Sequence, residues 1–401
     1  MKFSLAVAKA ALVGLAAATP LTSPKDAAGL EDRDYGYDAC EYEDNRCCKY
    51  QDWEYKEKGF KYDSEDDYDY RRTVYVKYPQ KIQDALNKAK YGDKIIVSAG
   101  TYKEQLTITK HGVQLIGKGA TLLPPDTLVD NQCSGIAGPG TQVGICITGY
   151  KVKLEPFLAE HQKVASVKNL VNDVLVTGFT ISQFPGINIA VVGARNARVA
   201  KNTITDGSVY GGLTIGSVNT HFDQNKVTAS AFGNIGICMD NKSGVLISGN
   251  KVSNQVIGLC VQTNRADVQY NDVTASCFGI FVDPGVDGAK IRHNHIGAAP
   301  FFCSPYTTGI LLDGAVNTKV LDNVVEGQLA DGPGRGIAIV DDPCTFQPLG
   351  LACITLGHAA TASGNVVLRN TLRDNDLDIS LESTGKKNVV ACNDIKKPVP
   401  T

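Results

Sequence analysis

The sequence has almost no net charge, no cluster of basic residues and no long apolar run. Its 401 residues include 40 Lys and Arg against 42 Asp and Glu, which gives a formal net charge of −2 at pH 7. We therefore expect no nucleic-acid partner, because proteins that bind nucleic acids usually carry a clustered basic surface. No apolar stretch reaches the roughly 18 residues that a transmembrane helix requires, so we also expect no membrane partner.

Apolar residues at helical spacing are scarce as well, and most of the chain alternates in the manner of β-strands. An asparagine recurs at intervals of 21 to 29 residues, with one interval of 47, and apolar residues stand three positions before and two positions after each one. The eight asparagines are Asn202, Asn225, Asn250, Asn271, Asn294, Asn323, Asn370 and Asn393. This repeat indicates a parallel β-solenoid. We expect the buried amides to stack, each hydrogen-bonded to the next coil.

A second anchor in each coil is a glycine followed by alternating apolar residues. The anchors are Gly186, Gly212, Gly236, Gly258, Gly279, Gly309 and Gly336, with Asp378 in the last coil. Alternation points the first and third residues after the anchor to one side, which in a solenoid is the interior. The second and fourth residues should therefore face outward.

The beginning of the solenoid carries a different pattern. Residues 78–90 place apolar side chains at helical spacing, which predicts an amphipathic helix that caps the first coil. The segment "ALNKAKYGDKIIVSAGTYKEQLTI" and the repeated asparagine and glycine frame resemble the right-handed parallel β-helix, or pectin-lyase-like, superfamily over about residues 74–397. The resemblance implies an all-β, single-stranded right-handed parallel β-helix. It does not choose an activity, because the superfamily contains lyases, hydrolases, uronate epimerases and members of unknown activity.

The ends of the chain are unlike the repeats. Residues 1–18 read as a secretory signal peptide, with Lys2, an apolar stretch and small residues before Thr19. Residues 19–72 form an acidic segment rich in Tyr and Cys, which we interpret as an arm, a small cystine-tied cap or a propeptide that ends at Arg71-Arg72. The β-helix domain is expected over residues 73–397.

Twelve cysteines are consistent with disulfides in an oxidising compartment. Local candidates are Cys133 with Cys146 and Cys344 with Cys353, which would close short loops. Cys238 and Cys260 occupy the same position on adjacent coils, either as a bridge or as two stacked thiols. Asn241-Lys242-Ser243 is the one acceptable N-glycosylation sequon, and its place in a turn after a strand makes Asn241 a candidate glycosylation site.

Polar residues at the fourth position after the anchor form a row over four consecutive coils. Its members are Asp240, Gln262, Asp283 and Asp313. Three interpretations remain open. Facing carboxylates could act as acid and base in glycoside hydrolysis. They could instead hold Ca²⁺, which would neutralise a uronate for a lyase. Or the aspartates simply end strands, because Asp suits turns.

Further candidates depend on how the groove along the solenoid is lined. Phe281 points outward, where it could stack on a sugar ring or contact an overlying loop. Arg335 precedes its strand and could reach the end of the groove. His293 and His295 also face outward, on what we expect to be a different face from the aspartates.

The activity patterns of the superfamily are matched only in part. The segment "GIFVDPGVDG" resembles a strand of the mannuronan epimerases that runs into Asp-Pro-His-Asp, but Gly285 stands at the histidine position and the acidic residue, Asp287, comes one position late. The paired Asp341-Asp342 resembles the polygalacturonase pattern, whose "Gly-His-Gly" and "Arg-Ile-Lys" elements are absent.

The functional hypothesis is a secreted, monomeric, carbohydrate-active protein that acts on an extracellular polysaccharide by lyase or hydrolase chemistry. Asp283, Asp313 and Asp240 are the candidate catalytic residues, and Gln262, Phe281, Arg335, His293 and His295 are candidate substrate contacts. Ca²⁺ is a possible cofactor. A non-catalytic glycan-binding protein of the cell wall and a uronate epimerase-like enzyme are the alternatives.

Overall fold

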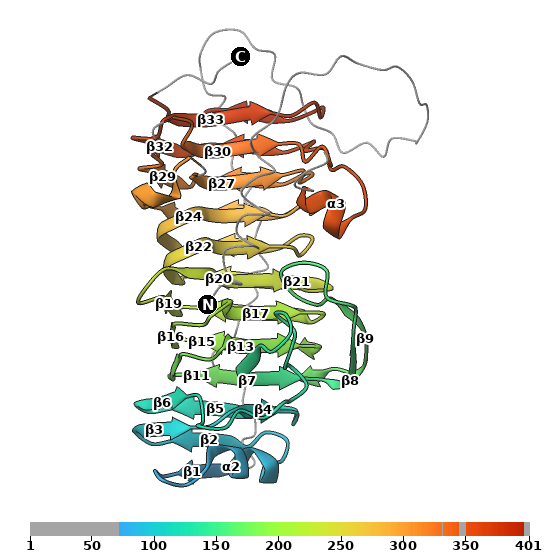
Figure 1. Cartoon of the computed structure of the whole chain (residues 1–401), viewed down its shortest axis with the longest axis vertical. Helices are drawn as coiled ribbons and strands as arrows, with labels where there is room; N and C mark the ends of the chain where they lie inside the picture. The colour runs from blue at the N-terminus through green and yellow to red at the C-terminus, as the bar shows by residue number, and fades with distance from the viewer. Residues whose placement is uncertain (1–71, 306, 331, 345–349, 397–401) are drawn as a thin grey trace. The chain divides into compact units, whose positions relative to one another are not determined.

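The computed structural model describes residues 72–305, 307–330, 332–344 and 350–396 (Figure 1). The predicted signal peptide, and all of the predicted arm except Arg72, lie outside these residues. The described strands coil into a right-handed parallel β-helix, which confirms the predicted fold class. No helix in the described part of the chain is long and apolar enough to cross a membrane.

Two long parallel sheets form the walls of the solenoid among the described residues. The first has an unbroken path of strands β1 (Thr73–Val76), β2 (Lys94–Val97), β5 (Gln114–Gly117), β11 (Leu175–Thr177), β15 (Arg198–Ala200), β18 (Val218–Asp223), β21 (Ser243–Ser248), β23 (Asp267–Gln269), β25 (Lys290–Arg292), β28 (Lys319–Leu321), β31 (Val366–Leu368) and β34 (Val389–Ala391). The short strands β10 (Val171–Asn172) and β14 (Ala194–Arg195) extend it.

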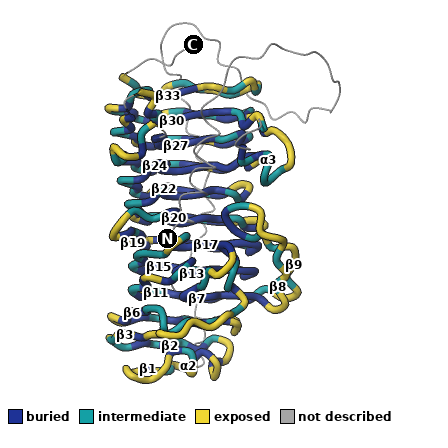
Figure 2. The backbone as a smooth tube through the Cα atoms, viewed as in Figure 1, coloured by how far each residue is buried: buried dark blue, intermediate teal, exposed yellow. Residues whose placement is uncertain are grey.

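The second sheet contains the longest strands of the protein. Its members are β3 (Gly100–Lys103), β4 (Leu106–Ile108), β6 (Ala120–Leu123), β7 (Gln142–Thr148), β12 (Thr180–Ser182), β13 (Gly186–Val192), β16 (Thr203–Thr205), β17 (Tyr210–Ile215), β19 (Lys226–Thr228), β20 (Gly233–Asp240), β22 (Lys251–Val261), β24 (Asp272–Val282), β26 (His295–Ile296), β27 (Thr308–Asp313), β29 (Val324–Glu326), β30 (Arg335–Val340), β32 (Thr371–Arg373) and β33 (Leu377–Glu382). Apolar side chains from both sheets fill the interior, and Figure 2 shows the buried strands in dark blue between exposed turns.

The eight predicted asparagines form one continuous ladder inside the solenoid. The Nδ2 group of each donates to the Oδ1 atom of the next asparagine along the chain, at 2.9 to 3.2 Å, and the same oxygen accepts a backbone N–H. For Asn250 the backbone bond comes from Asn225, at 3.0 Å. The structural role predicted for these asparagines is therefore confirmed.

A helix covers the first coil, as predicted, but it is shorter than the expected range of 78–90. Helix α2 (Ile82–Lys88) buries Ile82 and Leu86 against the apolar interior. The carboxylate of Glu104 caps the N-terminus of this helix. It accepts hydrogen bonds from the backbone N–H groups of Ile82 and Gln83 at 2.8 and 3.1 Å. Figure 1 shows α2 at the end of the stack beside β1 and β2.

The predicted register is correct for the later coils and wrong for two early ones. Gly236 is level with Gly211 rather than Gly212, because Tyr210 pairs with Ile235 and Gly212 with Ile237. Leu213 and Ile215 consequently face outward. The physical reason is Phe222, which needs interior space: a Cβ on Gly212 would lie 2.6 Å from its ring. In the preceding coil the level position is Asn188, not Gly186.

An antiparallel hairpin covers part of the outer face that was expected to be an open groove. It consists of β8 (Tyr150–Leu154) and β9 (Val164–Asn169) and lies beside the ends of β13 and β17 (Figure 1). Val152, Leu154 and Val164 pack on a second apolar cluster outside the solenoid. Glycine permits this close approach, since a Cβ on Gly216 would lie 2.4 Å from the Cβ of Val164.

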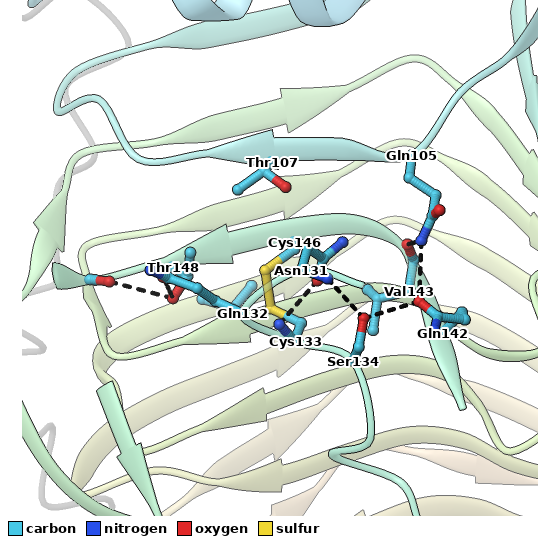
Figure 3. Close-up of a disulfide and its surroundings, with 12 residues drawn as sticks. Gln105, Thr107, Asn131, Gln132, Cys133, Ser134, Gln142, Val143, Cys146 and Thr148 are labelled. Carbon is cyan, nitrogen blue, oxygen red and sulfur yellow. Dashed lines mark hydrogen bonds between the residues drawn. A yellow bond between two sulfur atoms is a disulfide. The ribbon is translucent and has the colours of Figure 1, made fainter. Parts of the chain in front are cut away.

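Disulfides join the pairs Cys133–Cys146, Cys238–Cys260 and Cys344–Cys353, and a further one joins Cys277 to Cys303. The first three are the candidate pairs of the sequence analysis. Figure 3 shows how Cys133 fastens a loop to β7, where Ser134 donates to Gln142 at 2.8 Å and Gln105 donates to the same amide oxygen at 3.2 Å.

The side chain of Asn241 is not placed as expected for a glycosylation site. It lies in a turn directly after β20, but it points inward and is 7% exposed. Its Nδ2 group donates to Thr220 Oγ1 at 2.5 Å, and its Oδ1 atom accepts from Thr214 Oγ1 at 2.8 Å. The alternation that placed Asp240 outward turns the next side chain toward the interior.

Asn241 should therefore carry no glycan in the folded protein. A glycan on Nδ2 would break its hydrogen bonds and could not fit inside the solenoid. Mass spectrometry of protein secreted by a eukaryotic host, with and without peptide-N-glycosidase, should find the peptide that contains Asn241 unmodified. Glycan on most copies of that peptide would contradict the inward placement.

Replacing Asn250 with Leu should lower the melting temperature clearly. The substitution leaves the amide and backbone N–H of Asn225 without their acceptor, and each buried group left unpaired costs about 1–3 kcal/mol. Thermal unfolding followed by circular dichroism measures the effect, with the exposed neighbour Lys251→Ala as control. Equal melting temperatures for the two variants would show that Asn250 is dispensable.

Candidate functional site

The polar row predicted from the repeats forms where four neighbouring long strands end. Pairing of Val261 with Val282, and of Val282 with Leu312, places the following residues level on successive coils. The row contains Asp240, Gln262, Asp283 and Asp313. Apolar neighbours bound it, because Asp240 pairs with Ile215 below and Asp313 pairs with Val340 above.

The segment between β8 and β9 brings a fifth polar residue, Glu160, onto the row. The amide of Gln262 donates to Glu160 Oε2 and, at 2.7 Å, to Asp283 Oδ2. One oxygen of each carboxyl group lies within 4.8 Å of the other. Gln262 thus holds together two acidic side chains, of which Glu160 is 9% and Asp283 5% exposed.

The next residue of the same segment, His161, contacts the lower end of the row. Its Nδ1 atom lies 3.1 Å from the hydroxyl of Tyr210, and its Nε2 atom lies 3.4 Å from Asp240 Oδ2. Burial raises the pKa of Tyr210, so this hydroxyl keeps its proton and can donate to Nδ1.

Burial keeps a proton on the Glu160–Asp283 pair. Loss of hydration raises the pKa of Asp283 well above its ordinary value, and repulsion from Glu160 and Asp313 raises it further. Burial likewise raises the pKa of Glu160, against the smaller opposing attraction of His161, Gln262 and Lys163. Two carboxyl groups this close share a proton more readily than they carry two charges.

The carboxyl group of Asp313 has fewer hydrogen-bond donors than those of the other aspartates in the row. No hydrogen bond to its side chain is found among the described residues. Burial, together with repulsion from Asp342 and Asp341, raises the pKa of Asp313 to about 8. Asp313 is therefore protonated at neutral pH and available as a proton donor.

The two aspartates that repel Asp313 are fixed by donors of their own. Asp341 accepts from Ala362, Ser383 and twice from Thr384, at 2.6 to 2.9 Å. These hydrogen bonds outweigh its partial burial and lower the pKa of Asp341. Asp342 accepts the backbone N–H of Ala352, at 2.7 Å, at the start of helix α3 (Leu351–Thr355). Both have a structural role.

Two of the other predicted contacts lie near the row but are already engaged. Phe281 faces outward, as predicted, but it is 3% exposed and packs edge-on against Phe278, with ring centres 5.7 Å apart. The outer apolar cluster buries its ring, which favours contact with overlying residues over stacking on a sugar. Arg335 donates through Nε and Nη2 to Glu382, at 3.1 and 2.9 Å.

The two predicted histidines lie on another face, at the corner where β25 ends and β26 begins. His295 bridges Asp272 at 2.8 Å and Glu326 at 3.2 Å, and it is about half-exposed. His293 stacks on Tyr270 with ring centres 5.0 Å apart. Neither residue is brought to the aspartate row.

Glu160 and His161 were missed by the sequence analysis. They belong to an insertion without repeat anchors, so no periodic position marks them. The available signal was general: insertions over a rigid scaffold are frequent places for functional residues.

Comparison with known proteins identifies the family through the repeats. A family model described as the right-handed β-helix region matches residues 185–347 and, in an overlapping second match, residues 235–398. Together these matches cover more than half of the 401 residues. The chain belongs to the right-handed β-helix family.

Solved structures show how widely the right-handed β-helix is shared. The Dettilon tailspike protein aligns with a TM-score of 0.51 and 13% identity, over 80% of this chain and 66% of that one. The mannuronan C-5 epimerase A-module of Azotobacter vinelandii aligns with a TM-score of 0.49 and 14% identity, over 80% and 91%. The family 28 exopolygalacturonase of Yersinia enterocolitica aligns with 0.48 and 13%, over 82% and 77%. No curated protein matches the sequence. At this level of identity, the likeness to the tailspike protein shows the fold alone.

The acidic row offers few free ligand atoms for a calcium ion among the described residues. The described residues contain one group of three potential ligands, Glu160, Cys260 and Asp283. Cys260 is in a disulfide with Cys238 and cannot act as a thiolate. Gln262 donates to Oε2 of Glu160 and to Oδ2 of Asp283, which leaves Glu160 Oε1 and Asp283 Oδ1 without an N–H or O–H donor among the described residues.

Replacing Asp313 with Asn should stabilise the protein as the pH rises. The folded state keeps a proton on Asp313 up to about pH 8, whereas the unfolded state loses it near pH 4, so this carboxyl group makes folding less favourable across that range. The melting temperature of Asp313→Asn should exceed that of the wild type by a margin that grows from about pH 4 to pH 8. The exposed Asp374→Asn is the control. A pH-independent difference would contradict the raised pKa.

Proposed function

We propose that this protein is secreted and cleaves the glycosidic linkages of an extracellular polysaccharide by acid–base chemistry at the polar row. The observation that carries the proposal is the pair of acidic side chains on adjacent coils, Asp283 and Asp313. Both have a raised pKa, and Asp313 has no hydrogen-bonding partner among the described residues. Carboxyl groups that differ in environment in this way divide into proton donor and proton acceptor.

In hydrolysis, Asp313 gives its proton to the glycosidic oxygen as the bond to the anomeric carbon breaks. The Glu160–Asp283 pair takes a proton from the water molecule whose oxygen attacks that carbon. In elimination, the same pair would instead take a proton from the sugar ring, and Asp313 would again protonate the leaving oxygen. Both reactions need one group that donates a proton to the leaving oxygen and one that accepts a proton.

Access to the pair requires movement of the segment between β8 and β9. Glu160 belongs to this segment, and the bridge through Gln262 joins it to Asp283. The more accessible members of the row are Gln262, Asp240 and Asp313, which are only partly buried. A sugar that displaces residues 155–163 would then meet the whole row.

The four disulfides that join described residues support the proposal that the protein is secreted. Bonds of this kind persist in oxidising compartments and are rare in the cytosol. We do not extend the proposal to epimerisation. Gly285 stands where the epimerase pattern has its histidine, and His293 and His295 lie at another corner of the coil.

A non-catalytic glycan-binding protein is the second candidate. The observation that favours it is the closed bridge between Glu160, Gln262 and Asp283, in which one amide satisfies both acidic side chains. A bridge of this kind also has a purely structural use, because it fastens the hairpin to the solenoid.

Purified protein should release reducing ends from at least one polymer in a panel of neutral and acidic polysaccharides. Asp313→Asn and Asp283→Asn should each lower that rate on the order of 10²-fold or more, because each removes one partner of the proton transfer. The wild-type rate should also fall above about pH 8, as Asp313 loses its proton.

Asp84→Asn, an exposed change on the capping helix, is the matched control and should keep the wild-type rate. Binding without cleavage of any polymer would favour the glycan-binding candidate. Full activity in both row variants would remove the row from the mechanism.

A further inference from the structure

A second row of side chains runs along the corner of the solenoid where strands of the first sheet end. It consists of the residue that directly precedes each ladder asparagine, and we call it the corner row. Its members on five consecutive coils are Lys201, Gln224, Gly249, Tyr270 and His293, and all have positive φ. The whole length of β24 separates Tyr270 from Asp283, so the corner row and the polar row are distinct surfaces.

Two members of the corner row form an aromatic stack. The rings of Tyr270 and His293 are nearly parallel, at 8°, and their centres are 5.0 Å apart. Because this separation is close to the spacing of adjacent coils, about 4.8 Å, the two rings lie one above the other along the solenoid. Tyr270 is 59% exposed. One face of its ring therefore rests on His293, and the other is turned toward the coil of Gly249.

Gly249 leaves a gap in the corner row next to Tyr270. A Cβ on Gly249 would have one neighbour within 4 Å among the described residues, Gln224, whose Cγ would lie at 3.5 Å. Gln224 and Tyr270 are two coils apart, or about 9.6 Å. A single ring fits this gap in van der Waals contact with Tyr270 on one side and Gln224 on the other. We call the gap, bounded by Gln224, Gly249 and Tyr270, the slot.

Two exposed lysines stand beside the slot. Lys251 follows Gly249 by two residues and pairs with Lys226 on the preceding coil. Like charges on adjacent coils repel, and an anion bound between them would relieve the repulsion. The acidic residue level with Lys251 on the next coil is Asp272, whose Oδ1 atom lies 2.8 Å from His295 Nδ1. The two ammonium groups are thus placed to attract an anionic ligand.

We propose that the slot binds a uronate residue of an acidic polysaccharide, with the sugar ring on Tyr270 and its carboxylate at Lys226 and Lys251. A pyranose ring has a face of C–H groups that can pack on the aromatic ring, and hydroxyl groups that the Gln224 amide can bind. A lysine ammonium group binds a carboxylate through a charge-assisted hydrogen bond. The site does not depend on the proposed cleavage, and it would hold the protein on an acidic polymer whatever reaction the polar row performs.

The experiment measures how polymers embedded in native gels retard the protein. Every protein tested carries Asp313→Asn, so that chemistry at the polar row does not consume the polymer. The polymers are polygalacturonate, alginate and the same two after reduction of their carboxyl groups to primary alcohols. We expect retardation by at least one polyuronate, with weaker retardation by its reduced form. About 200 mM NaCl should weaken the retardation by the polyuronate, because it screens the lysine charges.

Two variants test the slot. Tyr270→Ala removes the stacking face, and Gly249→Asn fills the gap from its floor. Asn tolerates the left-handed backbone of Gly249, with φ of 64°, and its Cβ would meet Gln224 at an ordinary contact distance, so this variant should fold. Each should weaken binding about three- to tenfold. Tyr75→Ala, which changes a similarly exposed tyrosine of β1, is the matched control and should bind as the parent does.

A pair of lysine substitutions tests the charge. Lys226→Gln combined with Lys251→Gln should reduce retardation by the polyuronate and remove most of its salt dependence. The matched control is Lys290→Gln combined with Lys319→Gln, which changes another exposed pair of level lysines on adjacent coils, outside the corner row. This control should bind as the parent does.

Several results would overturn the inference. They are the absence of retardation by either polyuronate, equal retardation by a polyuronate and its reduced form, and binding by Tyr270→Ala and Gly249→Asn that matches Tyr75→Ala. Dextran sulfate and single-stranded DNA are included as polyanions without a uronate ring. Stronger retardation by either of them, unchanged in Tyr270→Ala, would show a general polyanion surface in place of a sugar site. None of these results bears on cleavage at the polar row.

Discussion

Stacked asparagine amides hold the coils of this protein in register. Each amide receives hydrogen bonds from the coil on one side and donates to the coil on the other, so a shift of one residue would leave several buried donors unpaired. The outward row depends on this constraint, because side chains alternate along a strand. A shift of one residue would turn Asp283 into the apolar interior. The ladder therefore keeps the candidate site in register, although no hydrogen bond joins the two.

The second determinant is the hairpin that covers the outer face. Its apolar side packs on Leu213 and Ile215, which face outward because Phe222 needs the interior space over Gly212. The connecting segment then carries Glu160 and His161 onto the row. Glu160 and Asp283 are buried where this segment meets the row, and burial raises the pKa of both.

The acidic residues divide according to their hydrogen-bond donors. Asp341 is surrounded by N–H and O–H groups and keeps its charge, and that charge acts on Asp313, which has no such donors. Asp341, which has a structural role, thus helps to raise the pKa of Asp313, the candidate proton donor. The raised pKa of Asp313 reduces the stability of the folded protein at neutral pH, and such local destabilisation is common at functional sites.

Local periodicity was sufficient to predict a parallel β-solenoid, the asparagine ladder and the four members of the row, because each depends only on alternation within a coil and on the repeat between coils. The sequence did not indicate which outward side chains would be covered. Phe281 was expected to face outward, toward a sugar or an overlying loop, and Asn241 was expected to be accessible to a glycan. Phe281 lies under the outer apolar cluster and Asn241 inside the solenoid. The one-residue offset of the coil around Gly212 follows from the size of Phe222, whose ring lies against Gly212 from another strand. The sequence of one strand alone does not predict this contact. Glu160 reaches Asp283 across 123 residues of chain, through a hairpin without repeats. The sequence by itself thus determined which residues could form a row. Only the tertiary structure decided which of them are buried together, because burial and charge repulsion depend on neighbours from distant parts of the chain.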